Sequence, residues 1–448
     1  MGRLFGTDGV RGIANTELTC ELALDIGRAA ALVLAKDGRR RPKFVIGTDT
    51  RASSPMLDAA LTAGLCSVGA EVIRLGVIPT PAVAYLVGKY KADAGIVISA
   101  SHNPAPFNGI KLFSGDGYKL PDELEEEIET LVLDGTGYPS PEGGEVGCVT
   151  VAANAAKDYI DHLKSTVMVA PQGMRVAVDC ANGAAAVTAE RLFTELGCDV
   201  TVLANTPNGV NINDGCGSTH LDCLAAYVTE NGLDMGIAFD GDADRCLCVD
   251  HTGAVVDGDE IMAICALDLR ERGKLTGNTV VGTIMTNFGF VKFCEQQGLQ
   301  FIATKVGDRY VLEELLLGDY AFGGEQSGHI IFRDFATTGD GQLTAVQLLS
   351  HLKRCGKSLH DLARVMKRYP QHTVNLNVSH EGKRLFYTNS AIKAAIEQAK
   401  TALEGNGRMV VRPSGTEPLI RVMAEGEDEA LVQKQVAAVA AVIREQLT

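Results

Sequence analysis

The sequence lacks several features that identify other classes of protein. None of its 12 cysteines forms a C-x-x-C pair, which argues against a zinc ribbon. Its apolar runs are much shorter than a membrane span, and the opening stretch MGRLFGTDGVRG contains no apolar signal region. The net charge is −15, so the chain has no excess of basic residues to bind nucleic acid or an anionic membrane. We therefore expect a reduced, cytoplasmic protein with no nucleic-acid or membrane partner.

Two ligand-binding loops are also missing. The stretch GKS at 356–358 ends like a P-loop, but the upstream glycine of that motif would fall at His351, so an ATP-driven kinase is not indicated. The stretch DGDADR beginning at Asp240 does not fit an EF-hand. Position 6 of such a loop is Arg245 instead of glycine, and position 12 is His251 instead of glutamate.

What the sequence does contain is an alternation of strands and helices. Short β-branched runs such as KFVIGTDTR, GIVISASH, MRVAVDCANG and DMGIAFDGDADR are separated by helical patterns. Continuously apolar strands in this arrangement predict an α/β fold with mixed, mostly parallel sheets. Each of these strands ends in a polar turn, and open α/β sheets bind ligands at the carboxyl ends of their strands.

Changes in this pattern divide the chain into four expected domains. At 448 residues the chain is too long for one ordinary core. Residues 134–147 read as a linker, and from about residue 370 the pattern becomes β-α-β-β-α, which predicts a smaller α+β domain. The expected domains are 1–150, 151–253, 254–369 and 370–448.

A serine stands where the strand GIVIS meets the turn ASHNP. Asn-Pro favours a turn, so ordinary turn chemistry is one interpretation of the hydroxyl of Ser101. The other is a reactive hydroxyl at the edge of a sheet.

The stretch DGDADR places carboxylates at Asp240, Asp242 and Asp244. In an extended loop alternate residues point the same way, so the three would converge and repel one another unless a hard divalent cation such as Mg²⁺ were bound. A solvated acidic turn is the alternative.

Two further stretches carry groups that suit a phosphorylated sugar. RPSGTEPLIR combines guanidiniums, hydroxyls and a glycine, which together suit a phosphate-binding loop, although a Pro-Gly hairpin is the alternative. Its candidates are Arg412, Ser414, Gly415, Thr416 and Arg421. GGEQSGH supplies Glu325 and Ser327 for sugar hydroxyls and His329 for a proton or a phosphate, while Arg11 and Lys111 are cations beside glycines.

One reaction uses all of these parts. A phosphorylated Ser101 would carry nearly two negative charges, and Mg²⁺ on the three aspartates would neutralise them during transfer to a sugar hydroxyl. The separate phosphate-binding loop would hold the phosphate that the sugar already carries.

Taken together, SASHNP, DGDADR, GGEQSGH and RPSGTEP occur in an order that resembles the α-D-phosphohexomutase family, over nearly the whole chain. The opening FGTDGVRG, GEQSGH and TKVGDRYV look most like its bacterial phosphoglucosamine mutases. The resemblance implies three related α/β domains and a TATA-binding-protein-like fourth domain around a central cleft.

The resemblance also implies roles for individual residues. Ser101 matches the phosphoserine and, with the three aspartates, a site for one Mg²⁺. Glu325 and Ser327 match sugar contacts, and the loop from Arg412 to Arg421 matches the phosphate-binding loop. The family also has cationic residues around the transferring phosphoryl group, and its general acid and base are among them. The residues of this chain that match them are Arg11, Lys111, Arg245 and His329.

The implied reaction interconverts glucosamine 6-phosphate and glucosamine 1-phosphate through glucosamine 1,6-bisphosphate, feeding amino-sugar nucleotide and cell-wall precursor synthesis. The partner is then a small sugar phosphate, and the resemblance suggests a homodimer. A phosphoglucomutase or phosphomannomutase of the same family is the main alternative. An aspartyl-nucleophile phosphatase using Asp240, or a non-catalytic sugar-phosphate sensor, is less well supported.

Overall fold

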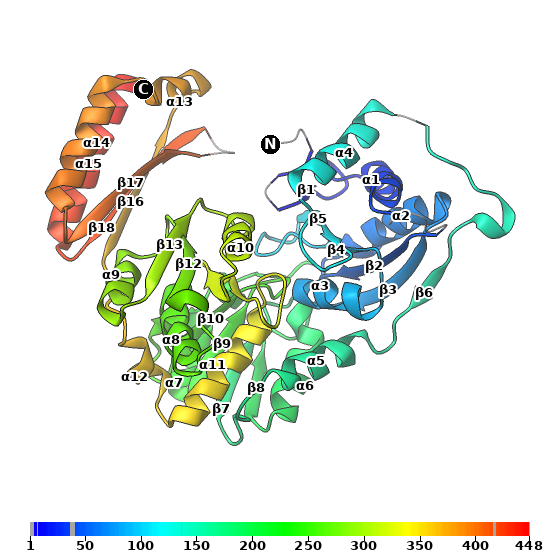
Figure 1. The fold of residues 1–448 in the computed structure, drawn as a ribbon, viewed down its shortest axis with the longest axis horizontal. Helices are drawn as coiled ribbons and strands as arrows, with labels where there is room; N and C mark the ends of the chain where they lie inside the picture. Colours follow the sequence, from blue (N-terminus) through cyan, green and yellow to red (C-terminus); the bar gives the residue numbers. More distant parts are fainter. Residues whose placement is uncertain (1–3, 7, 36–40, 136, 415–417, 448) are drawn as a thin grey trace. The chain divides into compact units, whose positions relative to one another are not determined.

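A computed structural model describes residues 4–6, 8–35, 41–135, 137–414 and 418–447. The chain forms two compact units, Met1–Thr283 with Thr304–Arg364 and Ile284–Ala303 with Val365–Thr448. Helices pack on sheets in both units (Figure 1). The sheets of the larger unit mix parallel and antiparallel strands, and the three-stranded sheet of the smaller unit is antiparallel, so the predicted fold class is confirmed. In this described part of the chain, every helix is too short or too polar to cross a membrane. The four domain boundaries remain predictions.

The first sheet of the larger unit has six strands in the order β1-β5-β4-β2-β3-β6. Strand β2 runs parallel to β3 and β4, whereas β5 is antiparallel to β4 and β1. The strands are β1 Val10–Ile13, β2 Lys43–Thr48, β3 Glu71–Val77, β4 Ala94–Ile98, β5 Phe107–Ser114 and β6 Val149–Val151. The helices are α1 Cys20–Val33, α2 Ser54–Ser67, α3 Thr80–Lys89 and α4 Asp122–Asp134. Every residue of β4 is buried, as its uninterrupted apolar run predicts.

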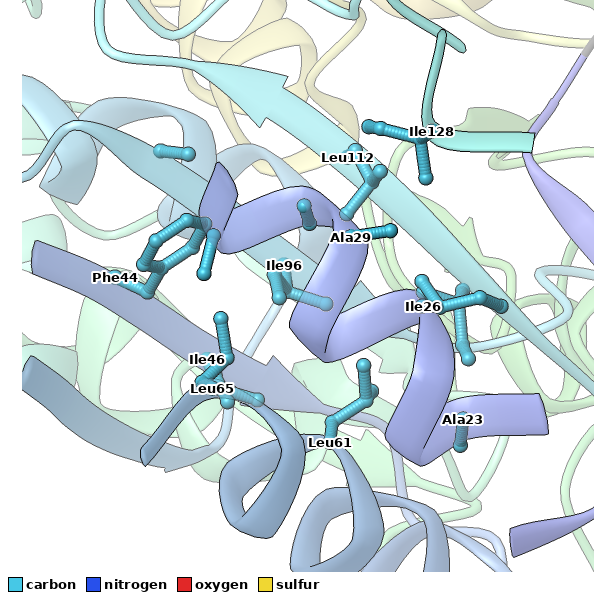
Figure 2. Packing of buried hydrophobic residues seen from close by; sticks show 14 of the residues in the cluster. Ala23, Ile26, Ala29, Phe44, Ile46, Leu61, Leu65, Ile96, Leu112 and Ile128 are labelled. Carbon is cyan, nitrogen blue, oxygen red and sulfur yellow. The ribbon is translucent and has the colours of Figure 1, made fainter. Parts of the chain in front are cut away.

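Helices α1 and α2 pack closely because each presents a glycine to the other. A Cβ on Gly64 would lie 2.1 Å from the carbonyl oxygen of Leu24, and one on Gly27 would lie 2.7 Å from that of Leu61. Figure 2 shows the buried side chains that these helices, α4 and the sheet contribute, among them Ala23, Ile26, Ala29, Phe44, Ile46, Leu61, Leu65, Ile96, Leu112 and Ile128. This packing holds rigid the strands whose ends carry the polar turns.

The second sheet has the order β11-β10-β9-β7-β8. Strand β7 is parallel to β8 and β9, but β10 is antiparallel to β9, so the chain reverses directly after β9. The strands are β7 Arg175–Asp179, β8 Asp199–Leu203, β9 Met235–Phe239, β10 Cys246–Asp250 and β11 Val255–Val256. The helices are α5 Ala155–Ser165, α6 Ala189–Glu195 and α7 Asp222–Glu230. The segment DGDADR is therefore the β9–β10 turn.

A third group of strands carries the segment GGEQSGH. Strand β12 is parallel to β14, and β14 is antiparallel to β15, so this segment is the turn between β14 and β15. The elements are α8 Gly258–Glu271, β12 Thr279–Thr283, α10 Asp308–Leu317, β14 Phe322–Gly324, β15 Ile330–Phe332, α11 Gly341–Cys355 and α12 Leu359–Ala363. A capping box formed by Asp257 and Glu260 begins α8.

The smaller unit contains an antiparallel sheet in the order β16-β18-β17. Its elements are α9 Phe288–Gln297, β16 Gln371–Asn377, α13 His380–Phe386, α14 Ser390–Leu403, β17 Gly407–Pro413, β18 Leu419–Gly426 and α15 Glu429–Leu447, and β13 Gln300–Thr304 follows α9. The predicted β-α-β-β-α order is confirmed, with α13 added before the first long helix. Apolar residues of the helices and the sheet form one core, including Ile392, Ile420, Val422, Val436 and Ile443.

Candidate active site

Ser101 lies in the turn after β4, close to the carboxylates that follow β9. Its side chain is buried, and its Oγ donates a hydrogen bond of 2.6 Å to Oδ2 of Asp240. Its φ of 52° is left-handed, which is uncommon for a serine and needs support from its surroundings. The neighbouring His102 places Nδ1 3.3 Å from the same Oγ. Burial, together with Arg245 and Arg11, lowers the pKa of His102 to about 4, so this imidazole is neutral at physiological pH.

Arg51, in the segment that follows β2, holds the Ser101 turn. It is fully buried, and its Nε donates 2.8 Å to Oδ2 of Asp49. Its Nη2 donates to the carbonyl oxygens of Ser101 at 3.1 Å and Asn103 at 2.7 Å, and its Nη1 donates to that of Pro104 at 2.6 Å. The guanidinium thus supports the backbone of the turn.

Replacing Arg51 with alanine is expected to lower the free energy of unfolding by about 3–5 kcal/mol, because Asp49 would remain buried without its partner. Urea denaturation followed by circular dichroism measures the change. Arg28→Ala is the matched control, since Arg28 pairs with Asp25 at 3.2 Å where both side chains are about one-third exposed. That change should cost less than about 1 kcal/mol. Equal, small losses for the two variants would contradict this account of Arg51.

The three aspartates of the β9–β10 turn converge. One carboxylate oxygen from each of Asp240, Asp242 and Asp244 lies within 4.8 Å of the others, and all three side chains are buried. The turn is not the extended loop that the spacing suggested, because Ala243 is left-handed at a φ of 59°. The reversal of the chain, instead of strand-like alternation, brings the carboxylates together.

The charge in this cluster is only partly compensated. Burial raises the pKa of Asp240, and the carboxylates of Asp244 and Asp242 raise it further. Asp242 differs: burial raises its pKa, but Lys111, whose Nζ lies 2.9 Å from Oδ2, more than offsets this effect and leaves the pKa below its usual value. The cluster therefore favours additional positive charge.

The residues present fit a hard divalent cation. Oδ1 of Asp242 and Oδ1 of Asp244 are buried, and neither has a hydrogen-bond partner among the residues that the structure describes. Buried carboxylate oxygens left in this way are the ligands that Mg²⁺ prefers.

Beside the aspartate cluster, further carboxylates lie close to the side chains of Lys111, Arg11 and His329. Lys111 lies on β5, with Nζ 3.3 Å from Oδ2 of Asp8 and 3.5 Å from Oδ2 of Asp244. Burial lowers the pKa of Lys111, but the carboxylates around it raise the pKa above its usual value, so the amine is held protonated.

Asp8 also forms ion pairs with Arg11 on β1 and with Lys119, which lies 2.6 Å away. Lys119 in turn pairs with Asp308 at the start of α10. Nε2 of His329 lies 3.5 Å from Oδ2 of the same Asp308. His329 is buried, and within the described ranges neither of its ring nitrogens has a hydrogen-bond partner.

The remaining candidate residues of the larger unit are Glu325, Ser327 and Arg245, and they make fewer contacts with the aspartate cluster and its charge network. Oε1 of Glu325 accepts a hydrogen bond of 3.1 Å from the backbone N–H of Gly307. Oγ of Ser327 is buried, without a partner in the part of the chain described. Arg245 lies 4.0 Å from Asp244, and its backbone N–H donates 3.2 Å to Oδ1 of Asp240. These polar atoms are positioned on turns, with hydrogen-bonding capacity still free on Ser327.

The smaller unit carries the candidate phosphate-binding loop. Arg412 on β17 is directly paired in register with Arg421 on β18, a like-charge neighbour that is unfavourable without an anion. Burial lowers the pKa of Arg412, and Arg421 lowers it further. Nε of Arg412 is buried and unpartnered within the described residues, while Nε of Arg421 donates 3.0 Å to Oδ1 of Asn375. Ser414 follows the last residue of β17, and its backbone N–H donates a hydrogen bond of 2.9 Å to the carbonyl oxygen of Leu419. The predicted Gly415 and Thr416 lie outside the described residues.

Four family models match this chain. Those described as phosphoglucomutase/phosphomannomutase alpha/beta/alpha domains I, II and III match residues 2–138, 157–253 and 257–369, and the C-terminal domain of the same family matches residues 374–442. The chain belongs to the phosphoglucomutase/phosphomannomutase family. This is the resemblance that the motifs predicted.

Individual relatives from this family agree in sequence and in fold. A phosphoglucosamine mutase of Thermoanaerobacter sp. (strain X514) is 53% identical over 447 residues, covering 100% of both chains. A phosphoglucomutase/phosphomannomutase family protein from Burkholderia thailandensis has a TM-score of 0.84 at 22% identity, over 99% of this chain and 98% of that one. An N-acetylphosphoglucosamine mutase of Aspergillus fumigatus, solved with GlcNAc-6P and magnesium, has a TM-score of 0.70 at 16% identity, over 99% and 96%.

Several residues at this family site were not anticipated from the sequence. Asp8, Lys119 and Asp308 complete the charge network, and Arg51 supports the serine turn. A signal existed for two of them, because Asp8 stands beside Arg11 in GTDGVRG and Asp308 stands in TKVGDRYV. Their pairing through Lys119 links segments too distant in sequence for a local pattern to reveal.

Proposed function

We propose that this protein interconverts glucosamine 6-phosphate and glucosamine 1-phosphate through a phosphorylated Ser101. The observation that carries the proposal is the 2.6 Å contact between Oγ of Ser101 and the buried Asp240, in a chain 53% identical over its whole length to a phosphoglucosamine mutase. The match favours that substrate over those of the phosphoglucomutase and phosphomannomutase alternatives. A cytoplasmic location, a homodimer and a supply role in amino-sugar nucleotide synthesis are further parts of the proposal.

In the first half-reaction a sugar hydroxyl attacks the phosphorus atom on Ser101. The new bond joins O1 of glucosamine 6-phosphate to phosphorus, the bond to Oγ breaks, and the hydroxyl proton passes to a base. One Mg²⁺ would be held by the phosphoserine and the converging carboxylates of Asp240, Asp242 and Asp244. When bound, Mg²⁺ neutralises charge on the transferring phosphoryl.

The proton steps are assigned to Lys111 and His329. Lys111 is held protonated by the surrounding carboxylates, which suits it to stabilise or protonate the serine oxygen as the phosphoryl leaves. His329 has two ring nitrogens available, which suits it to accept the proton of the sugar hydroxyl. Arg11 and Arg245 would support the phosphoryl oxygens, and Glu325 with Ser327 would bind sugar hydroxyls.

In the second half-reaction the 1,6-bisphosphate turns over and returns its 6-phosphoryl to Ser101. The phosphate-binding loop must then accept either end of the sugar. Paired guanidiniums suit this task, because Arg412 and Arg421 recognise a phosphate by its charge and oxygens instead of the sugar's shape. Ser414, Gly415 and Thr416 would add hydroxyl and backbone donors. A hinge near residue 370 would let the C-terminal domain move during the turnover.

Replacing Arg412 with alanine is expected to raise the KM for the sugar phosphate by roughly tenfold to hundredfold, since charge-assisted hydrogen bonds contribute about 1.5–3 kcal/mol. Steady-state kinetics measure this change. Arg384→Ala is the matched control, because Arg384 lies in the same unit with its side chain 83% exposed. The control should keep its KM. An unchanged KM for Arg412→Ala would contradict phosphate binding by this residue.

The substrate is tested by comparing turnover of the 1-phosphates of glucosamine, glucose and mannose. The proposal predicts the largest kcat/KM for glucosamine 1-phosphate. A larger kcat/KM for glucose 1-phosphate or mannose 1-phosphate would favour the alternative activity within the family.

A further inference from the structure

The turn that carries Ser101 is bound by a side chain from a distant part of the chain, Asn213. Its Nδ2 donates hydrogen bonds of 2.9 Å to the carbonyl oxygen of Ser101 and 3.1 Å to that of Asn103. Asn213 is buried, and its own backbone N–H donates 2.9 Å to the carbonyl oxygen of Ala181, just beyond β7. Asn213 therefore ties the serine turn of the first sheet, through its side-chain amide, to the end of the second sheet, through its backbone N–H.

The same two carbonyl oxygens also bind Arg51. Nη2 of Arg51 lies 3.1 Å from the oxygen of Ser101 and 2.7 Å from that of Asn103. Each carbonyl oxygen thus accepts two hydrogen bonds, one from a residue after β2 and one from Asn213, and uses its full accepting capacity. This double support explains how a serine with a φ of 52° is held in place.

The backbone of the aspartate turn lies against the same point. A Cβ added to Gly241 would stand 2.6 Å from the carbonyl oxygen of Ser101 and 2.9 Å from Nδ2 of Asn213. Gly241 sits between the carboxylates of Asp240 and Asp242. Asn213 is therefore located where the serine turn and the aspartate turn meet.

We propose that Asn213 is a positioning residue that fixes the Ser101 hydroxyl against the Asp240 carboxylate, an inference that rests on the proposed function. Asn213 acts through the backbone of Ser101, because both of its side-chain bonds go to carbonyl oxygens of that turn. Its task is needed in each half-reaction, when the phosphoryl leaves Ser101 and when it returns. Misplacement of a reacting group by about 1 Å lowers the rate roughly hundredfold. Loss of Asn213 should therefore reduce kcat and leave sugar binding intact.

The test compares Asn213→Ala and Asn213→Asp with Asn211→Ala in the full-length enzyme. Alanine removes the two donors, and aspartate keeps the size of the side chain but presents oxygen to both carbonyl groups. Asn211 is the matched control, because among the residues that the structure describes its side chain bonds within its own loop, to the backbone of Asn208 and Thr206. The readouts are kcat, KM for glucosamine 1-phosphate, the single-turnover rate of phosphoryl transfer from phosphorylated enzyme, and the unfolding midpoint.

Both Asn213 variants are expected to lose about tenfold to hundredfold in kcat and in the single-turnover rate, with KM changed less than about threefold. Asn211→Ala should keep the wild-type kcat even if its unfolding midpoint falls. A kcat within about twofold of wild type in Asn213→Ala, or an equal loss of kcat in Asn211→Ala, would overturn the proposal. If Ser101→Ala is inactive, either of those results would contradict the positioning role of Asn213 and leave the proposed function standing. Activity in Ser101→Ala would instead overturn the proposed function itself.

Discussion

Replacing Ser101 with alanine is expected to abolish mutase turnover, lowering kcat by about 10⁴-fold or more. Alanine has no oxygen to carry the phosphoryl group, so neither half-reaction has a covalent intermediate. The fold should survive, because the hydroxyl makes its short contact with a single carboxylate oxygen, on Asp240, and one such bond contributes about 1–3 kcal/mol. Coupled assays of glucosamine 1-phosphate formation measure the loss, and circular dichroism verifies the fold.

Ser165→Ala is the control for this change. Ser165 is an exposed serine at the end of α5 whose hydroxyl bonds to the carbonyl oxygen of His162. Its removal should leave kcat unchanged. An aspartyl-nucleophile phosphatase using Asp240 would still hydrolyse its substrate in Ser101→Ala. Retained release of inorganic phosphate by that variant would therefore favour this alternative. Retained mutase activity would contradict the phosphoserine mechanism.

Replacing Asp244 with asparagine is expected to lower Mg²⁺-dependent kcat by about 10²–10³-fold, since a preorganised electrostatic group at a reacting centre contributes on this scale. Asp244 is the most informative of the three aspartates to change. Asp240 contacts Ser101, and Asp242 binds both Thr80 and Lys111, so substituting either of them disturbs other bonds as well. Asp244 makes longer ion pairs, 3.5 Å to Lys111 and 4.0 Å to Arg245, and its Oδ1 has no hydrogen-bond partner among the described residues.

Metal binding has a second readout that does not depend on catalysis. Buried carboxylates that repel one another destabilise the metal-free fold, and a ligand that binds only the folded state raises the unfolding temperature. Mg²⁺ should therefore raise the unfolding midpoint of the wild type, a chelator should reverse the shift, and Asp244→Asn should remove it. Asp161→Asn, at an exposed ion pair with Lys157 on α5, should retain the shift. An equal Mg²⁺ shift in Asp244→Asn and wild type would contradict a site at these aspartates.

The sequence predicted the fold class because its signals are local. An apolar run such as GIVIS reports its own burial, and the β-α-β-β-α order after residue 370 follows from periodicity within each segment. The carboxylate cluster was also predicted, although for an incomplete reason. Alternation along an extended loop was assumed, whereas the left-handed Ala243 turns the chain back from β9 to β10.

The supporting residues could not be predicted in the same way. Asn213 contacts Ser101 across 112 positions of sequence, and Lys119 contacts Asp308 across 189. Nothing in the segment NINDG around Asn213 indicates that its amide binds two carbonyl groups in another sheet. Such pairings depend on how the sheets pack, which composition and periodicity do not encode locally.

The central claim is that Ser101 carries the phosphoryl group that is transferred. Intact-mass measurement with peptide mapping, before and after incubation with excess sugar phosphate, tests it most directly. We predict a single phosphoryl group on the peptide that contains Ser101, and its exchange with a labelled glucosamine 1,6-bisphosphate. An active enzyme whose label is absent, or is found only on another residue, would contradict the account.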